Sequence, residues 1–201
     1  MFKKYRMDNE MFYLVIDIET KNTYSEIGVN DPTKLIPSYI GIYRSDTDKY
    51  EGYFGNDFEK FFTLLEKADY AVGYNIDGFD FEVLKPLCPY NLSKIPTVDM
   101  YKIAYTFSHV HIKLDNIAST TLGYGKSGDG LGAVRLFKEG KLDDLAKYCL
   151  DDVKITKEIY DYARKEGRLF YLDGMGMKTE VDIKMPAYIP KKIKEEGFGL
   201  F

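Results

Sequence analysis

The clearest pattern near the start of the chain is an almost unbroken apolar run at residues 12–18, rich in aromatic and β-branched side chains. Such a run is typical of a strand that is covered on both faces, so we expect a central strand here. Two more strand-like runs, at residues 39–43 and 50–54, flank the polar stretch 44–48, which predicts a hairpin turn. The sheet should therefore begin as an antiparallel meander.

Helical spacing dominates the middle of the chain. Apolar side chains at residues 57–67 predict an amphipathic helix that Asn56 or Asp57 could cap. A strand at residues 70–74 then leads into a helix at 77–87, which a proline-containing stretch ends. Three further helices are predicted at residues 100–107, 113–122 and 142–165. One face of the last helix carries Leu145, Tyr148, Cys149, Asp152 and Ile155.

The pattern changes again toward the C-terminus, where short strand-like runs at residues 169–172 and 179–183 lie on either side of a polar turn. They predict a hairpin at residues 166–185, followed by a basic tail at 186–201. Because no repeat or linker divides the chain, we expect one domain at residues 1–201 with its core at about 10–165. The fold class is α/β, with a mixed sheet of antiparallel and parallel strands flanked by helices.

Composition and charge change this picture little. The chain has 201 residues and a formal net charge of −4, which would ordinarily disfavour a nucleic-acid partner. That objection is weak if carboxylates hold divalent cations, because the cations neutralise them. Cys88 and Cys149 lack the spacing of a zinc site or redox pair, so we interpret both as reduced, packed thiols. No membrane span or signal peptide is predicted, and we expect a cytoplasmic protein without a membrane partner.

Two carboxylates lie at the end of the first strand. Asp17 and Glu19 are two residues apart, so both side chains project from the same face of the sheet. Paired carboxylates repel each other unless a cation neutralises them, and their hard oxygen atoms suit Mg²⁺ or Mn²⁺. The alternative is an ordinary solvated strand end.

A second candidate element lies where the strand at residues 70–74 turns into a helix. Asn75 could hold this turn, and Asp80, about one helical turn further on, could reach toward Asp17. The alternative is that Asp77 or Asp80 only favours the helix N-terminus electrostatically, and we assign Asp77 to that role.

A third candidate element lies in the long helix at residues 142–165. Tyr148 and Asp152 are four residues apart and therefore share one helix face. Apolar neighbours flank that face, so it should point toward the sheet, where a buried aspartate needs a cation or a donor. An ordinary polar helix side is the alternative.

Together these segments resemble the three exonuclease motifs of the DEDD superfamily, in its tyrosine branch. The matching residues are Asp17-Ile18-Glu19-Thr20, Asn75 with Phe79-Asp80, and Tyr148-Cys149-Leu150-Asp151-Asp152. The order and spacing look most like the proofreading exonuclease domain of family B DNA polymerases, over roughly residues 10–165.

The resemblance implies a ribonuclease H-like fold and a two-metal 3′–5′ exonuclease that hydrolyses phosphodiester bonds at the 3′ end of DNA. Asp17 would bridge two Mg²⁺ or Mn²⁺ ions, and Glu19, Asp80 and Asp152 would complete the ligand set. Tyr148 would orient the attacking water, since a phenol with an ordinary pKa of ~10 is a poor base at neutral pH. Thr20, Asn75 and Phe79 are expected to contact the substrate.

Weaker signals stay open. Lys126, in a glycine-rich loop, could bind a substrate phosphate, although an ordinary solvated loop fits equally well. We interpret His109 and His111 as structural or surface residues, with contact to the substrate as the lesser alternative. The apolar end of the basic tail loosely resembles short peptides by which replication proteins bind sliding clamps, which would imply a replication or repair partner. A tail that packs its end on the domain is the simpler alternative.

The expected partner is nucleic acid, with single-stranded 3′ ends of DNA as the first candidate. Two alternatives remain from the sequence, namely an exoribonuclease that trims RNA 3′ ends and a subunit that binds nucleic acid without cutting it.

Overall fold

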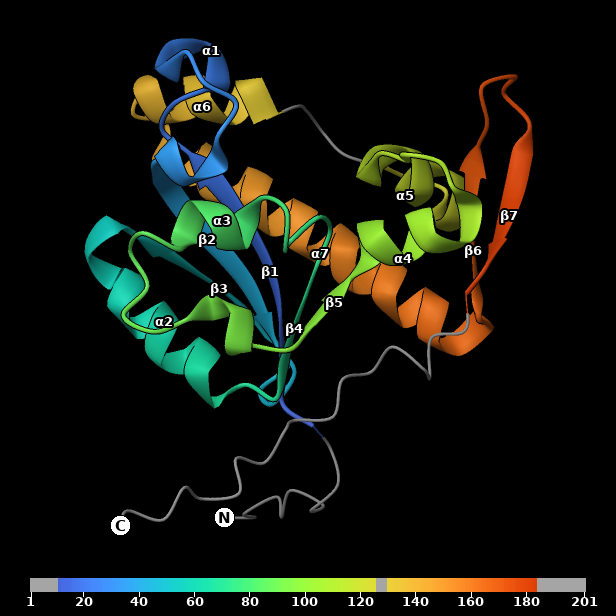
Figure 1. The fold of residues 1–201 in the computed structure, drawn as a ribbon, viewed down its shortest axis with the longest axis horizontal. Coiled ribbons are helices and arrows are strands. Elements are labelled where there is room, and N and C mark those ends of the chain that lie inside the picture. Colours follow the sequence, from blue (N-terminus) through green and yellow to red (C-terminus); the bar gives the residue numbers. More distant parts are fainter. Residues whose placement is uncertain (1–10, 126–129, 184–201) are drawn as a thin grey trace.

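A five-stranded mixed sheet forms the centre of the computed structural model, which describes residues 11–125 and 130–183. The strand order is β3-β2-β1-β4-β5 (Figure 1). The first three strands form an antiparallel meander, and the last two run parallel to the central strand. Their bounds are β1 (Tyr13–Thr20), β2 (Pro37–Arg44), β3 (Lys49–Phe54), β4 (Tyr70–Gly73) and β5 (Thr97–Asp99). The predicted mixed α/β sheet is therefore confirmed.

Successive side chains of β1 point to opposite faces of the sheet and join two different apolar clusters. Leu14, Ile16 and Ile18 pack on the face covered by α2 (Phe58–Lys67) and α3 (Asp80–Leu84). Tyr13 and Val15 pack on the other face.

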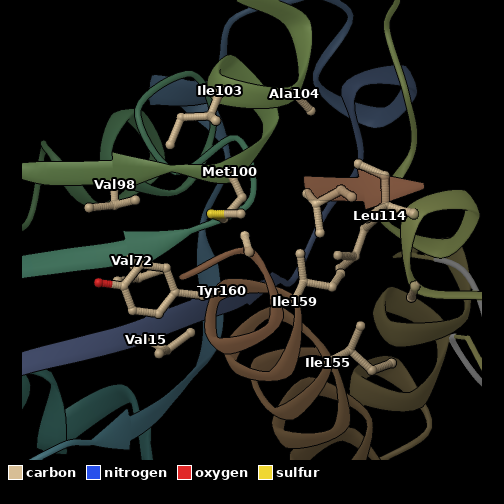
Figure 2. Close-up of a cluster of buried hydrophobic side chains, with 14 of the residues drawn as sticks. Val15, Val72, Val98, Met100, Ile103, Ala104, Leu114, Ile155, Ile159 and Tyr160 are labelled. Carbon is tan, nitrogen blue, oxygen red and sulfur yellow. The ribbon is translucent and has the colours of Figure 1, made fainter. Parts of the chain in front are cut away.

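This second face is covered by α4 (Met100–Ser108), α5 (Leu114–Leu122) and α7 (Leu142–Glu166). Figure 2 shows Val15, Val72 and Val98 from the strands meeting Ile155, Ile159 and Tyr160 of α7. The long helix α7 thus lies across the strand face to which Asp17 and Glu19 belong.

Most predicted elements are present, and four predicted helices lie within one residue of α2, α4, α5 and α7 at each end. The helix predicted at 77–87 is wrong in extent, because α3 covers only Asp80–Leu84. The cap predicted at the start of α2 is also wrong, since Asp57 makes no capping hydrogen bond and a 3₁₀ turn, Gly55–Asp57, enters the helix. Two helices, α1 (Tyr24–Ile27) and α6 (Gly130–Lys138), were not predicted.

The predicted C-terminal hairpin forms a separate two-stranded sheet, β6 (Arg168–Leu172) and β7 (Lys178–Asp182), beside α5 (Figure 1). Polar side chains of α5 bind the free edge of β6. Thr121 Oγ1 accepts from Phe170 N–H at 2.9 Å, and Asn116 Oδ1 accepts from Leu172 N–H at 2.7 Å. The hairpin is thereby fixed to the helical layer. The predicted tail at 186–201, with its proposed partner contact, lies outside the described residues.

Candidate metal centre

The carboxylates of β1 lie on the sheet face that α7 covers. Asp17 is half-buried and Glu19 is only 7% exposed. They continue the alternation of Tyr13 and Val15, so strand geometry alone brings both carboxylates toward α7. The β1–β2 register shifts between Glu19 and Thr20, which ends the regular pairing at this point.

The close approach of α7 to the sheet depends on a glycine in β2. Gly41 pairs with Asp17 across the β1–β2 ladder. A Cβ atom at Gly41 would lie 2.8 Å from Sγ of Cys149 and 3.2 Å from Cγ2 of Val153. Any larger residue would therefore collide with α7, and the absent side chain is what lets the helix pack directly over Asp17.

Cys149 occupies the space that Gly41 leaves open. Its thiol is buried and donates to the Asp17 backbone oxygen at 3.3 Å and to Asp17 Oδ2 at 3.4 Å. Burial raises the pKa of this thiol well above its usual value, and the charges of Asp17 and Glu19 raise it further. Cys149 is therefore a neutral hydrogen-bond donor at neutral pH. The prediction of a reduced, packed thiol fits this environment, but its contact with Asp17 was not foreseen.

The same helix brings Asp152 and Tyr148 to this face. Asp152 is 2% exposed, and its charge also raises the pKa of the Cys149 thiol. Tyr148, one turn earlier, is buried and packs in a cluster with Tyr39 of β2 and Ala133 of α6. The predicted orientation of this face toward the sheet is what the structure has.

Asp80 reaches Asp17 from the other side of β1. β4 pairs with β1 only as far as Val15, so the backbone groups of β1 beyond Val15 on this edge can bond to other residues. The backbone N–H of Ile18 donates to the Asp80 carboxylate, which is 4% exposed at the start of α3. Burial raises the pKa of Asp80 well above its usual value, and the nearby charge of Asp17 adds to this effect. The two carboxylates are thus close enough to repel each other.

Asp99, at the end of β5, holds the loop that precedes Asp80. Its carboxylate accepts from Asn75 N–H at 2.9 Å and from Asp77 N–H at 3.3 Å, and it also caps α4 through Tyr101 N–H at 3.1 Å. These bonds anchor the loop. Helix α3 begins only at Asp80 because Phe79, directly before it, has a non-helical backbone with φ of −129° and ψ of −70°.

Asn75 itself has a left-handed backbone, with φ of 65°, and its carbonyl accepts from Phe79 N–H at 2.9 Å. A Cβ atom at Gly78 would lie 2.6 Å from Asn75 Oδ1, so the amide side chain lies against that glycine. Asn75 therefore lies at the predicted turn and shapes it through its backbone conformation. Asp77 forms an ion pair with Lys102 at 2.7 Å, and since it precedes the short helix, its predicted place within the first helical turn is wrong.

The other residues that were predicted to contact the substrate do not converge on one point of the structure. Thr20 is buried beside Glu19, where its hydroxyl donates to the Asn22 carbonyl at 2.9 Å. Phe79 is half-buried and packs on the cluster beneath α2 and α3. Lys126 lies outside the described residues. The charges of Asp17, Glu19 and Asp152 all act on the Cys149 thiol, and the charge of Asp17 acts on Asp80, so these four carboxylates gather around the end of β1. Tyr148 lies one helical turn before Asp152 in α7.

The segments that supply these side chains lie within a region that matches a known protein family. The family model of the RNase H superfamily matches residues 14–164, from β1 to α7. The chain belongs to the RNase H superfamily. This match includes all three segments that carry the acidic side chains, and it confirms the ribonuclease H-like fold expected from the motifs.

Among solved structures, this RNase H superfamily chain is similar to the family B DNA polymerase from the hyperthermophilic archaeon Pyrobaculum calidifontis. The TM-score is 0.58 with 23% sequence identity, and the similarity covers 77% of this chain but 25% of the polymerase. The likeness therefore concerns the fold, and this chain spans about a quarter of the polymerase's length. No curated protein matches the chain. None of the described helices combines the length and apolar character that crossing a bilayer requires.

The donor chemistry of this RNase H superfamily chain fits a hard divalent cation. Asp17, Glu19 and Cys149 offer ligand atoms that all lie within 4.8 Å of one another. Two of these three groups are carboxylates, whose hard oxygen atoms are the ligands that Mg²⁺ prefers. A bound cation would also offset the charge of Asp17, which adds to burial in raising the pKa of Asp80.

Three residues that position this centre were missed by sequence reasoning. Gly41 lies in a strand where a glycine gives no local signal of the helix packed against it. Asp99 was also missed, although an aspartate directly before a predicted helix is a typical N-cap. The contact of Cys149 with Asp17 joins residues 132 positions apart, and no spacing rule predicts it.

Proposed function

We propose that this chain is a metal-dependent 3′–5′ exonuclease that removes nucleotides from the 3′ end of DNA. The observation that carries the proposal is the convergence on Asp17. Cys149 of α7 donates to the Asp17 carboxylate at 3.4 Å, and the charge of Asp152 in the same helix adds to burial in raising the pKa of that thiol. Burial, and then the charge of Asp17, raise the pKa of Asp80 in α3. Three segments far apart in the chain thus bring acidic groups to one strand end, as two-cation hydrolysis requires.

The four carboxylates can be given distinct roles. Asp17 lies between the carboxylate supplied by α3 and the carboxylate supplied by α7. It is the candidate ligand shared by two Mg²⁺ or Mn²⁺ ions. Glu19 and Asp152 on one side, and Asp80 on the other, would complete the ligand set. Two bound cations would supply activation of the attacking water and stabilisation of the leaving 3′ oxygen.

Tyr148 is the candidate for orienting the attacking water. It lies one helical turn from Asp152 and is held by the apolar cluster of Tyr39 and Ala133. A hydroxyl fixed in this way can direct a lone pair of water toward phosphorus by one hydrogen bond, without removing a proton itself. The protein would thus contribute alignment rather than a side-chain base.

DNA is the proposed substrate because the similar solved structure is a DNA polymerase and because the three motifs resemble proofreading exonucleases. RNA 3′-end trimming by the same centre is the alternative. Cutting from the 3′ end, rather than internally, is supported by the tyrosine-branch form of the third motif.

Digestion of 5′-labelled single-stranded DNA, duplex DNA and RNA of one sequence, with Mn²⁺ or Mg²⁺, tests this proposal. We expect DNA ladders that shorten from the 3′ end for the wild type, no products for D17A, and wild-type products for D151N. Asp151 is the matched control because it neighbours Asp152 but is half-exposed. RNA-only ladders would favour the alternative, internal cuts would reject the exonuclease assignment, and binding without products would indicate a non-catalytic subunit.

A further inference from the structure

An aromatic cluster outside the carboxylate centre lies on α4 and the segment that follows it. Met100, Ile103 and Ala104 of α4 face the core (Figure 2). With 3.6 residues per turn, Tyr101 and Tyr105 lie one above the other on a different side of the helix. Tyr105 is 40% exposed, so part of its side chain is accessible to a ligand.

His111 joins the two tyrosines into one surface, which we call the aromatic platform (Tyr101, Tyr105 and His111). The His111 ring is stacked on Tyr105, with centroids 4.6 Å apart and planes at 20°. Its Nδ1 atom forms a hydrogen bond with the Tyr101 hydroxyl. His109 makes the return possible, because its left-handed backbone, with φ of 56°, ends α4 and turns the chain back.

The aromatic platform is continuous with the loop that carries Asp80. The Tyr74 ring meets Tyr101 edge to face at 5.9 Å, and its hydroxyl donates to the Ile112 carbonyl at 2.6 Å. Tyr74 directly precedes Asn75. The Asp99 carboxylate accepts from the backbone N–H groups of both Asn75 and Tyr101. The platform and the Asp80 loop are therefore held in a fixed relation.

We propose that the aromatic platform stacks against bases of an unpaired nucleic-acid strand whose 3′ end enters the carboxylate centre. This inference rests on the proposed function and names the form of substrate that the same centre would take. Every base has a π face, so ring stacking binds single strands of any sequence. Bases within a duplex are already stacked on their neighbours, so the platform favours unpaired nucleotides. Lys113, exposed two residues after His111, adds a positive charge nearby for backbone phosphates.

Binding of a labelled 12-nucleotide oligothymidylate to the full chain in EDTA tests the platform without cleavage. We expect Y105A and H111A each to raise the Kd about tenfold, the usual range for one lost stacking contact. Y105L, which keeps apolar bulk but not the ring, should behave like Y105A. Y50A is the control, because Tyr50 is also 40% exposed but lies in β3 at the opposite sheet edge. Thermal melts of each variant check the fold.

An abasic strand of equal length separates stacking from charge, and its binding should be the same for wild type, Y105A and H111A. Equal losses with the abasic strand, an unchanged Kd for oligothymidylate, or no binding by the wild type would each overturn the proposal. The two proposals fail separately. Loss of oligothymidylate binding in Y105A, together with an absence of metal-dependent cleavage by the wild type, would retain the platform and reject the nuclease. Normal 3′ cleavage by the wild type, with no effect of Y105A on oligothymidylate binding, would retain the nuclease and reject the platform.

Discussion

Gly41 pairs with Asp17 across the β1–β2 ladder, and a Cβ atom at Gly41 would lie only 2.8 Å from Sγ of Cys149. The same position is also 3.3 Å from Cδ2 of Leu150. Helix α7 can therefore reach the Asp17 carboxylate only because β2 has no side chain here. The distance between the β1 acids and Asp152 is set by a residue that carries no chemistry of its own.

Substitution G41A should push α7 away from β1. Overpacking of this kind costs about 1–3 kcal/mol, although alanine is intrinsically favoured over glycine in a strand. We expect a lower melting temperature, by about 2–4 °C for each kcal/mol, and weaker stabilisation by Mn²⁺. Differential scanning calorimetry with and without Mn²⁺ measures both effects. G174A, where a Cβ atom would meet open space, should leave both unchanged. Wild-type Mn²⁺ stabilisation in G41A would contradict the spacing role of Gly41.

Substitution D80N should stabilise the metal-free protein at neutral pH. Burial, and then the charge of Asp17, raise the folded-state pKa of Asp80 above its unfolded value. The stability associated with the neutral carboxyl is therefore fully present below the unfolded pKa of about 4, and it is lost as the pH rises toward the folded pKa. At pH 7 the wild type carries this penalty, which an uncharged asparagine removes.

Thermal melts of wild type and D80N in EDTA, between pH 4 and pH 7, follow this difference. The advantage of D80N should be largest at pH 7 and should shrink toward pH 4. Added Mn²⁺ should stabilise the wild type more than D80N, because the cation offsets the same repulsion. A wild type that is more stable than D80N in EDTA at pH 7 would indicate that Asp80 is not strained by its acidic neighbour.

Substitution Y148F should impair orientation of the attacking water while leaving metal and substrate binding intact. The ring remains packed against Tyr39 and Ala133, so the melting temperature and Mn²⁺ affinity should be close to those of the wild type. We expect kcat for single-stranded DNA to fall by about 10²-fold, in the range of a lost proton-positioning group, with KM little changed. Steady-state kinetics provide the values. A kcat within twofold of the wild type would exclude an orienting role for the hydroxyl.

The fold could be predicted from local patterns where those patterns are long. The apolar run of β1 and the periodicity of α7 gave the right elements, because burial on a defined face leaves a repeating signal. The three-residue strand β5 is too short to repeat, and α6 begins among glycines, which have poor helix propensity. Helix α3 starts later than its pattern because the left-handed backbone of Asn75 and the non-helical backbone of Phe79 delay its start to Asp80.

The candidate site was likewise predictable from the sequence only in part. Asp17 and Glu19, or Tyr148 and Asp152, share a face by simple spacing, so each pair could be predicted by itself. Their approach to one another depends on the tight contact at Gly41, and Asp80 depends on the early end of the β1–β4 pairing. Such contacts between distant segments leave no periodic signal in the chain.

Calorimetric titration of the full chain with Mn²⁺ tests the shared metal centre most directly. We expect two ions per chain for the wild type, the same result for D151N, and loss of both ions in D17N, because Asp17 is the ligand common to both. Saturable binding of two ions that D17N leaves unchanged, or no saturable binding by the wild type, would contradict the assignment of Asp17, Glu19, Asp80 and Asp152 to one centre.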